Sequence, residues 1–458
     1  MRLDTPQALI KLMPYIPHTE ADRKAMLETI GVSSIDELFR EIPEKLRIKG
    51  DLEVPDALDE YRLFGHLKRL SEKNVDLSRV TCFLGAGIYD RYIPATVGAV
   101  LSRGEFLTAY TPYQPELSQG YLQTIYEFQT MVAELYGMEV ANASMYDGAT
   151  AIAEAAIMST SVTKRNSVYV SEALHPHYRQ VIDTYCWSMG IEVVEVPVNE
   201  GATTDFSKVG DDAASVVIQQ PNFFGVIEDL ELARSASRRH GALFLVSADP
   251  TACGILPPPG QFDADIVTGE GQPLGIPMGY GGPLLGLFTC KREFIRAIPG
   301  RIVGRTQDNK GNPGYTMTLR TREQDIRREK ATSNICTNEA LMALAATVYM
   351  TAVGKNGIRS IAESTVRNTQ YAIERLATNG AKLKFGQKVF GEFVLELPLD
   401  ASIVRDRLLE KGILAGLPLG EYWPSLSQCM LVAVTEVRTK AEIDWFVTEL
   451  HRAIKGRP

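Results

Sequence analysis

The chain has 458 residues, of which 45% are hydrophobic, and a formal net charge of −8. A chain of this length can bury a large core and is expected to divide into two or three domains. The negative balance excludes a general electrostatic attraction to nucleic acid or to an anionic membrane surface.

No segment predicts export or membrane insertion. The start, residues 1–24, lacks a continuous apolar stretch of signal-peptide length, and no later stretch is long and charge-free enough to span a bilayer. The six cysteines are scattered, without a Cys-x-x-Cys pair or histidines at zinc-ligand spacing. We therefore expect a cytoplasmic protein with buried thiols and no metal site.

Residues 1–79 are expected to form an N-terminal helical arm. Short helical stretches are joined by proline-containing links, and Ser34 with Glu37 has the spacing of a capping box. This arm has too little apolar surface to fold alone, so we expect it to pack on the main body or on a partner chain.

Residues 80–310 predict a large α/β domain. Six β-rich runs alternate with helical stretches: SVYVSE, IEVVEVPV, ASVVIQQP, LFLVSADP, ADIVTG and LGLFTC. Several are nearly continuous hydrophobic runs, which is typical of parallel strands covered on both faces. The intervening helical patterns indicate βαβ crossovers.

Residues 311–458 predict a connector, a long helix and a smaller α+β C-terminal domain. The stretch from 335 to about 375 is rich in Ala, Leu and Met and is the helix candidate. The alternating segments GEFVLELP and CMLVAVTEV predict half-exposed strands. Thr439 with Glu442 predicts the cap of the last helix.

The segment from Asp249 to Gly286 carries the strongest chemical signal. It contains an acid at a strand end, a second strand and the glycine-rich turn GQPLGIPMGYGGPLLG. This order resembles pyridoxal-phosphate-dependent enzymes of fold type I, the aspartate-aminotransferase-like fold. In those enzymes the acid pairs with the pyridine nitrogen and a lysine just ahead of the turn forms the Schiff base. Here the lysine position is Gln272, whose amide nitrogen is not a nucleophile, so the chain is not expected to hold the cofactor covalently.

Longer blocks give a more specific resemblance. They are SSIDELFREIP, FLGAGIYDRYIP, YTPYQPELSQGYLQTIYEFQTMVAEL, ASMYDGATAIAEA, GQPLGIPMGYGGP and TREQDIRREKATSNICTNEAL, and they span residues 33 to about 340. Through these blocks the chain resembles the alpha, or first, subunits of split glycine dehydrogenases (decarboxylating), which belong to the P-protein family of the glycine cleavage system.

That resemblance implies an activity shared with a beta subunit, glycine dehydrogenase (aminomethyl-transferring), in a heterotetramer. The beta subunit would hold pyridoxal phosphate on its own lysine, and glycine would be decarboxylated there. The aminomethyl group would pass to the lipoyl group of the H-protein, with the T- and L-proteins as functional associates. No residue of this chain is then expected to be catalytic, because Gln272 replaces the Schiff-base lysine although Pro277 and the following glycines preserve the turn.

Four residues are candidates for a vestigial cofactor pocket: Gly148, Thr150, His175 and Asp249. The first two open a helical run behind Asp147, where free N–H groups either bind a phosphate or are capped by that aspartate. His175 takes a ring-stacking or loop position; a metal site with His177 is the alternative, but no further ligand accompanies the pair. Asp249 either stabilises a pyridinium or starts a turn before proline.

Six residues are candidates for a cleft shared with the beta subunit: Tyr89, Asp90, Tyr113, Ser118, Gln119 and Arg301. Tyr89 and Asp90 lie on a loop after Gly85 and Gly87, where a dinucleotide site is excluded because Asp90 occupies the third glycine position. A packed loop is the alternative there. Tyr113, Ser118 and Gln119 lie at the entrance of a predicted helix, where an ordinary cap is the alternative.

Arg301 belongs to a basic stretch. Residues 291–330 contain eleven Lys and Arg against five Asp and Glu. The chief contributors are Arg301, Arg305, Arg320, Arg322, Arg327 and Arg328. The stretch is either a solvated face or a guiding surface for the acidic H-protein that the resemblance implies.

Two other functions stay open. A self-sufficient pyridoxal enzyme would need another lysine, and Lys291 and Lys310 are the nearest. Lys291 lies on the wrong side of the glycine turn, and Lys310 lies in a polar loop that would not desolvate an amine. The other alternative is a non-enzymatic scaffold or regulator that has inherited the fold.

Overall fold

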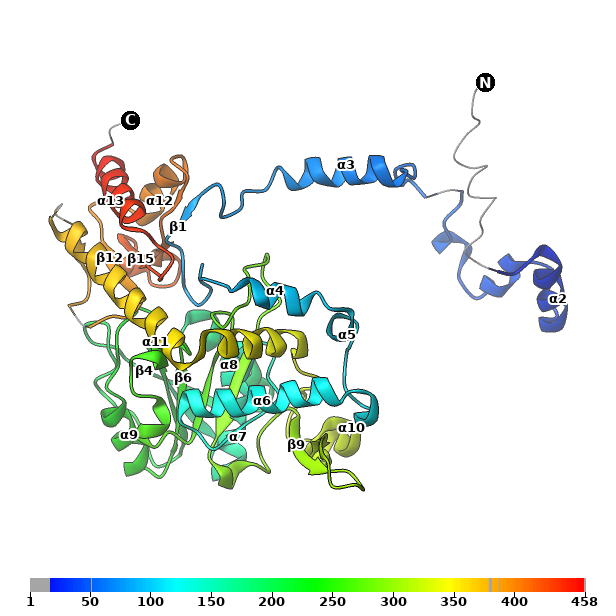
Figure 1. The fold of residues 1–458 in the computed structure, drawn as a ribbon, viewed down its shortest axis with the longest axis horizontal. Coiled ribbons are helices and arrows are strands. Elements are labelled where there is room, and N and C mark those ends of the chain that lie inside the picture. The colour runs from blue at the N-terminus through cyan, green and yellow to red at the C-terminus, as the bar shows by residue number, and fades with distance from the viewer. Residues whose placement is uncertain (1–16, 51, 379–380, 387, 457–458) are drawn as a thin grey trace. The chain divides into compact units, whose positions relative to one another are not determined.

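A computed structural model describes residues 17–50, 52–378, 381–386 and 388–456. The chain divides into two compact units, Met1–Asp76 and Leu77–Pro458 (Figure 1). Within the described ranges no helix is long and apolar enough to cross a membrane.

The first unit is helical. It contains α2 (Glu20–Ile30), α3 (Glu60–Ser71) and two short 3₁₀ helices, η1 (Ile35–Phe39) and η2 (Glu44–Leu46). The capping box predicted at Ser34 is wrong: its side chain makes no cap hydrogen bond, and the Glu37 carboxylate instead accepts from the Ser33 N–H (3.3 Å). None of the described residues up to position 76 is buried, so the described part of this unit has no core of its own.

The centre of the second unit is a seven-stranded sheet in the order β2-β8-β7-β6-β5-β3-β4. Its strands are β2 (Val140–Ala141), β3 (Ser167–Ser171), β4 (Glu192–Val196), β5 (Ala213–Gln220), β6 (Leu243–Ala248), β7 (Ile266–Glu270) and β8 (Gly286–Cys290). The pairs from β4 to β7 are parallel, whereas β8 runs antiparallel to β7 and to β2. All six hydrophobic runs predicted as strands are therefore confirmed. The last of them reverses direction because a glycine turn, not a helix, joins it to β7.

Helices cover both faces of this sheet. One face packs on α6 (Gln119–Tyr136), α9 (Leu230–Arg239) and the first half of α11 (Ala340–Thr378), and the other on α7 (Gly148–Thr163) and α8 (Pro176–Ser188). Phe244 and Val246 of β6 enter the first core and Leu245 enters the second, as the two-residue period of a strand requires. Helices α6 and α11 lie side by side (Figure 1). Two short helices, α4 (Ala95–Leu101) and α5 (Gly104–Leu107), precede α6 in the chain.

The C-terminal part contains a four-stranded antiparallel sheet. Its strands are β11 (Lys382–Leu383), β12 (Glu392–Glu396), β15 (Cys429–Ala433) and β14 (Leu417–Pro418), which pack with α12 (Ala401–Leu409) and α13 (Lys440–Lys455). The capping box of Thr439 with Glu442 is confirmed. The predicted long helix is also confirmed as α11, but it is broken at Gly354, whose φ is 60°.

Two pairings cross the domain boundaries that the sequence suggested. Strand β1 (Thr81–Cys82) pairs in parallel with β13 (Ile413–Leu414) of the C-terminal part. The hairpin of β9 (Ile302–Gln307) and β10 (Pro313–Thr318) encloses position 310, and α10 (Gln324–Arg327) follows it. The large α/β part and the smaller α+β part together have the architecture of fold type I, while the predicted division at 79 and 310 stays a prediction.

Candidate functional site

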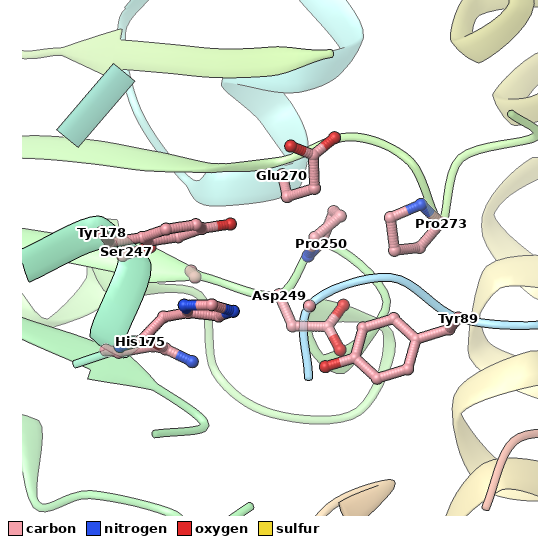
Figure 2. Close-up of a pocket in the computed structure, with 11 residues that line it drawn as sticks. Tyr89, His175, Tyr178, Ser247, Asp249, Pro250, Glu270 and Pro273 are labelled. Atoms are coloured by element: carbon pink, nitrogen blue, oxygen red, sulfur yellow. The ribbon is translucent and has the colours of Figure 1, made fainter. Parts of the chain in front are cut away.

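A pocket lies at the carboxyl ends of β5, β6 and β7, the edge at which open α/β sheets usually bind ligands. The residues of the lining that matter most are Tyr89, His175, Tyr178, Asp249, Glu270 and Pro273 (Figure 2). They come from strand ends, from the start of α8 and from the loop after β1. None of the described lining residues is a lysine.

Gln272 is a buried connector between two loops. Its neighbour Pro273 lines the pocket, and Gln272 itself is 2% exposed. The amide oxygen accepts from the Tyr89 N–H (3.0 Å), and the amide nitrogen donates to the carbonyl oxygens of Tyr89 (3.1 Å) and Ile276 (2.8 Å). Both ends of the amide are therefore engaged with backbone, and the side chain offers no nucleophile.

His175 is a neutral ring held by its neighbours. It caps α8, where its Nδ1 accepts from the His177 N–H (3.1 Å), and its Nε2 donates to the Ala86 carbonyl (2.9 Å). Burial lowers the pKa of His175 to about 4. Its ring stacks on that of Tyr178, with centroids 4.6 Å apart. Within the described ranges no cluster of three histidine, cysteine or acidic residues could hold a metal ion.

Asp249 faces a cation that the chain itself supplies. One of its oxygens accepts from the Thr251 N–H (2.7 Å), which is the predicted turn. The other lies 3.7 Å from Nη2 of Arg91, a guanidinium whose side chain is 3% exposed and which also pairs with Glu436 (2.7 Å). No pattern in the sequence indicated that Arg91 would reach this acid.

Tyr89 closes the other side of the pocket. Its hydroxyl donates to Oε2 of Glu392 (2.8 Å), and the Ala86 N–H donates to Oε1 of the same carboxylate (2.7 Å). Burial raises the pKa of Glu392 to about 7 and holds that of Tyr89 well above its usual range. Glu392 is the first residue of β12, far from Tyr89 in the sequence. The only sequence sign of its role is that it is a charged residue in a hydrophobic strand.

The start of α7 is capped twice by carboxylates. Asp147 accepts from the Thr150 N–H (2.7 Å) in a capping box, and Glu270 accepts from the Gly148 N–H (2.9 Å). Burial raises the pKa of Glu270 to about 7, although backbone N–H groups oppose that shift. The residues of this pocket therefore do not fit pyridoxal phosphate: the amine is missing, and carboxylates hold the N–H groups that a phosphate would use.

The shared-cleft candidates fall into two groups. Tyr89 lines the pocket, whereas Tyr113, Gln119 and Arg301 do not line it and make contacts of their own. Arg301 lies over the Tyr113 ring and its Nη2 donates to the Tyr113 hydroxyl (3.2 Å). Gln119 bonds both backbone groups of Tyr315 in β10 (2.8 and 2.9 Å).

Ser118 and Asp90 lie outside both groups. Ser118 precedes α6, but its side chain makes no cap hydrogen bond. Asp90 binds Arg438 of the C-terminal part (2.6 Å) rather than facing the pocket. The structure thus brings Tyr89 together with His175 and Asp249 and keeps the other candidates apart from them.

Neither alternative lysine reaches the pocket. Burial alone would lower the pKa of Lys291, but its hydrogen bonds to Asp263 and Asp265 (2.7 and 2.5 Å) outweigh it, and the pKa is raised. Its amine is therefore held in the protonated form. Lys310 lies exposed in the turn between β9 and β10.

The basic stretch is only partly a surface. The assignment of Arg301 and Arg322 to a guiding surface is wrong, because both are buried: Arg301 pairs with Glu323 (3.4 Å), and Arg322 donates to backbone carbonyls that include that of Gly300 (3.0 Å). Arg320 pairs with Asp325. The described residues of this stretch that stay exposed include Arg305, Lys310, Arg327, Arg328 and Lys330.

The sequence and the fold were compared with known proteins. The family model "Glycine cleavage system P-protein" matches residues 13–450. Proteins named "Probable glycine dehydrogenase (decarboxylating) subunit 1" from Anoxybacillus flavithermus and Geobacillus kaustophilus are 51% and 52% identical over 439 and 440 residues, which is 95% of this chain and 98% of each relative.

A solved structure of glycine decarboxylase (P-protein) of the glycine cleavage system, in inhibitor-bound form, is 41% identical with a TM-score of 0.88. That match covers 96% of this chain and all of the solved chain. A glutamate decarboxylase from Lactobacillus brevis has a TM-score of 0.66 at 15% identity over 90% of this chain and 96% of its own, a likeness of fold alone.

Proposed function

Since the chain belongs to the glycine cleavage system P-protein family, we propose that it is the non-Schiff-base subunit of a heteromeric glycine decarboxylase. With a second, lysine-bearing subunit that holds pyridoxal phosphate, it decarboxylates glycine and transfers the aminomethyl group to the lipoyl group of the H-protein. The proposed enzyme is glycine dehydrogenase (aminomethyl-transferring), a cytoplasmic heterotetramer that works with the T- and L-proteins. The relatives' name, subunit 1, supports a partner subunit.

One observation carries this proposal: the Schiff-base position is an amide that the fold uses as a connector. Gln272 makes three hydrogen bonds to two loops, and none of the described residues that line the neighbouring pocket is a lysine. A chain that acted alone would need an amine at this place. The amine must then come from another subunit, and this chain positions groups around the second subunit's cleft.

The segment from the end of α5 to the start of α6 supports a surface for that second subunit. Leu107, Tyr110, Tyr113 and Leu117 are 58%, 73%, 54% and 82% exposed. Large apolar side chains gathered on one exposed segment are typical of protein interfaces. We propose that this segment contacts the second subunit, with Tyr113 and Arg301 at the edge of the shared cleft.

The decisive experiment is reconstitution. The chain alone, the lysine-bearing subunit alone and their mixture are assayed for exchange of the glycine carboxyl group with labelled bicarbonate, in the presence of lipoylated H-protein. We expect exchange only in the mixture. An exchange rate of the second subunit that is unchanged by this chain would indicate the scaffold alternative, and exchange by this chain alone would indicate a self-sufficient enzyme.

Variants of surface residues test which side chains of this chain contribute to the activity of the mixture. Tyr113→Phe removes the hydroxyl that accepts from Arg301 and should lower the turnover of the mixture severalfold, whereas Tyr110→Phe, three residues earlier, should not. Arg327→Glu with Arg328→Glu should raise the KM for H-protein and leave the KM for glycine unchanged. Arg359→Glu, an exposed change on α11, is the matched control.

A further inference from the structure

The carboxylate of Glu270 collects backbone donors from three segments. Glu270 is the last residue of β7 and is 8% exposed. Its Oε2 accepts from the Gly148 N–H (2.9 Å), and its Oε1 accepts from the N–H groups of Gln272 (2.9 Å) and Leu285 (3.1 Å). Figure 2 shows this carboxylate at the upper rim of the pocket, facing away from Asp249. One buried acid thus joins the start of α7 to the glycine turn.

These donors are of the kind that hold a phosphate in other proteins. Gly148 is the first residue of α7, a helix of 16 residues whose N-terminus carries partial positive charge. The N–H of Thr150 is taken by Asp147 (2.7 Å). A phosphate placed here would meet two carboxylates at short range, and like charges at short range repel.

The space beside Gly148 is also tightly packed. A Cβ added at Gly148 would lie 2.6 Å from the hydroxyl of Tyr178 and 3.1 Å from Cβ of Glu270. The first residue of α7 is therefore packed to contact distance against these two side chains. At the opposite side, Asp249 has Arg91 as its cation. Each charged group that a coenzyme of this fold would bring has a counterpart within the chain.

We propose that Glu270 is a built-in substitute for the phosphate group of the coenzyme. Its carboxylate fixes the start of α7 to the glycine turn, Arg91 balances Asp249, and Gln272 closes the turn. The chain therefore reaches its working conformation without coenzyme and binds no pyridoxal phosphate, even non-covalently. This inference deepens the proposed function, on which it rests for the assignment of the coenzyme to the second subunit.

The test is a chemical rescue of Glu270→Ala. This variant leaves three N–H groups without their acceptor, and an added anion can take its place. We expect a lowered midpoint of thermal unfolding in chloride, and a rise of several degrees when inorganic phosphate replaces chloride at about 20 mM and equal ionic strength. The wild type should show no such rise. Glu154→Ala, which removes a buried acid of α7 away from the start of that helix, should be destabilised without rescue.

A second measurement uses the wild type and does not depend on a folded variant. Equilibrium dialysis with pyridoxine 5′-phosphate, which lacks the aldehyde and cannot bond surface lysines, should show no binding to this chain at millimolar concentration. Binding of that probe, or a folded Glu270→Ala that ignores phosphate, would overturn the inference. Loss of carboxyl exchange in the reconstituted mixture would instead count against the proposed function, so the two failures are distinct.

Discussion

Replacing Gln272 by methionine tests whether the amide is a structural connector. Methionine has a similar length and volume but neither donates nor accepts strongly, so the change removes three hydrogen bonds and leaves little cavity. The Tyr89 N–H and the carbonyl oxygens of Tyr89 and Ile276 then lose their partner. A buried polar group left unpaired costs about 1–3 kcal/mol. The lower end of this range for each of the three groups gives about 3 kcal/mol in total.

Urea denaturation followed by tryptophan fluorescence measures this loss. Gln272→Met should lower the urea midpoint while the dependence on urea stays the same, since the surface exposed on unfolding does not change. The matched control is Gln370→Met on the exposed face of α11, where the amide bonds only Glu374 (3.0 Å). Its effect should stay within about 0.5 kcal/mol, as for most surface changes. Equal midpoints for the wild type and Gln272→Met would refute the connector role.

The remaining predictions concern the charges around the same pocket. Glu392 has its pKa raised to about 7 by burial, so its stabilising contribution is full below pH 4.5 and is lost as the pH rises through 7. Between about pH 5.5 and 8 the wild type should lose about 2 kcal/mol relative to Glu392→Gln, and parallel pH profiles of unfolding would contradict this. Arg91→Met should destabilise by about 3–5 kcal/mol because Asp249 and Glu436 both lose their cation; adding Asp249→Asn should recover the part of the loss that belongs to Asp249 in the same urea assay, and no recovery would disprove that pairing. Gln272→Lys alone should form no Schiff base because Glu270 still occupies the start of α7, and peptide mapping after borohydride reduction with pyridoxal phosphate would reveal any adduct at position 272.

The strands of the large sheet could be predicted because each buried strand corresponds to a short, nearly continuous hydrophobic run in the sequence. Val216, Val217 and Ile218 of β5 are all buried, since helices cover both faces, and a short β-branched run of this kind is typical of a strand in such a position. The break of α11 at Gly354 could not be predicted, because the helical pattern contains both Gly354 and Gly357, and isolated glycines in such a pattern are usually tolerated. The cap at Ser34 failed because the neighbouring Ser33 takes the Glu37 carboxylate.

The pocket was only half predictable from the sequence. Asp249, His175 and Gln272 could be named because each has a fixed place in a known order of strands and turns. Their partners could not be named. Gly148 and Glu270 are 122 positions apart, and Tyr89 and Gln272 are 183 positions apart. Such contacts depend on how the sheet and the loops pack together, so a local sequence pattern cannot predict them.

The internal pairing explains why losing the lysine need not have cost the fold. A pocket that has lost its coenzyme would keep N–H groups at a helix start, an acid without its cation and an open turn, and each of these costs free energy when buried. In this chain Glu270 accepts from the helix start, Arg91 lies beside Asp249, and Gln272 bonds the turn to the loop that carries Tyr89. The same contacts hold that loop in place. A subunit that must shape its partner's cleft needs this rigidity more than it needs a cofactor of its own.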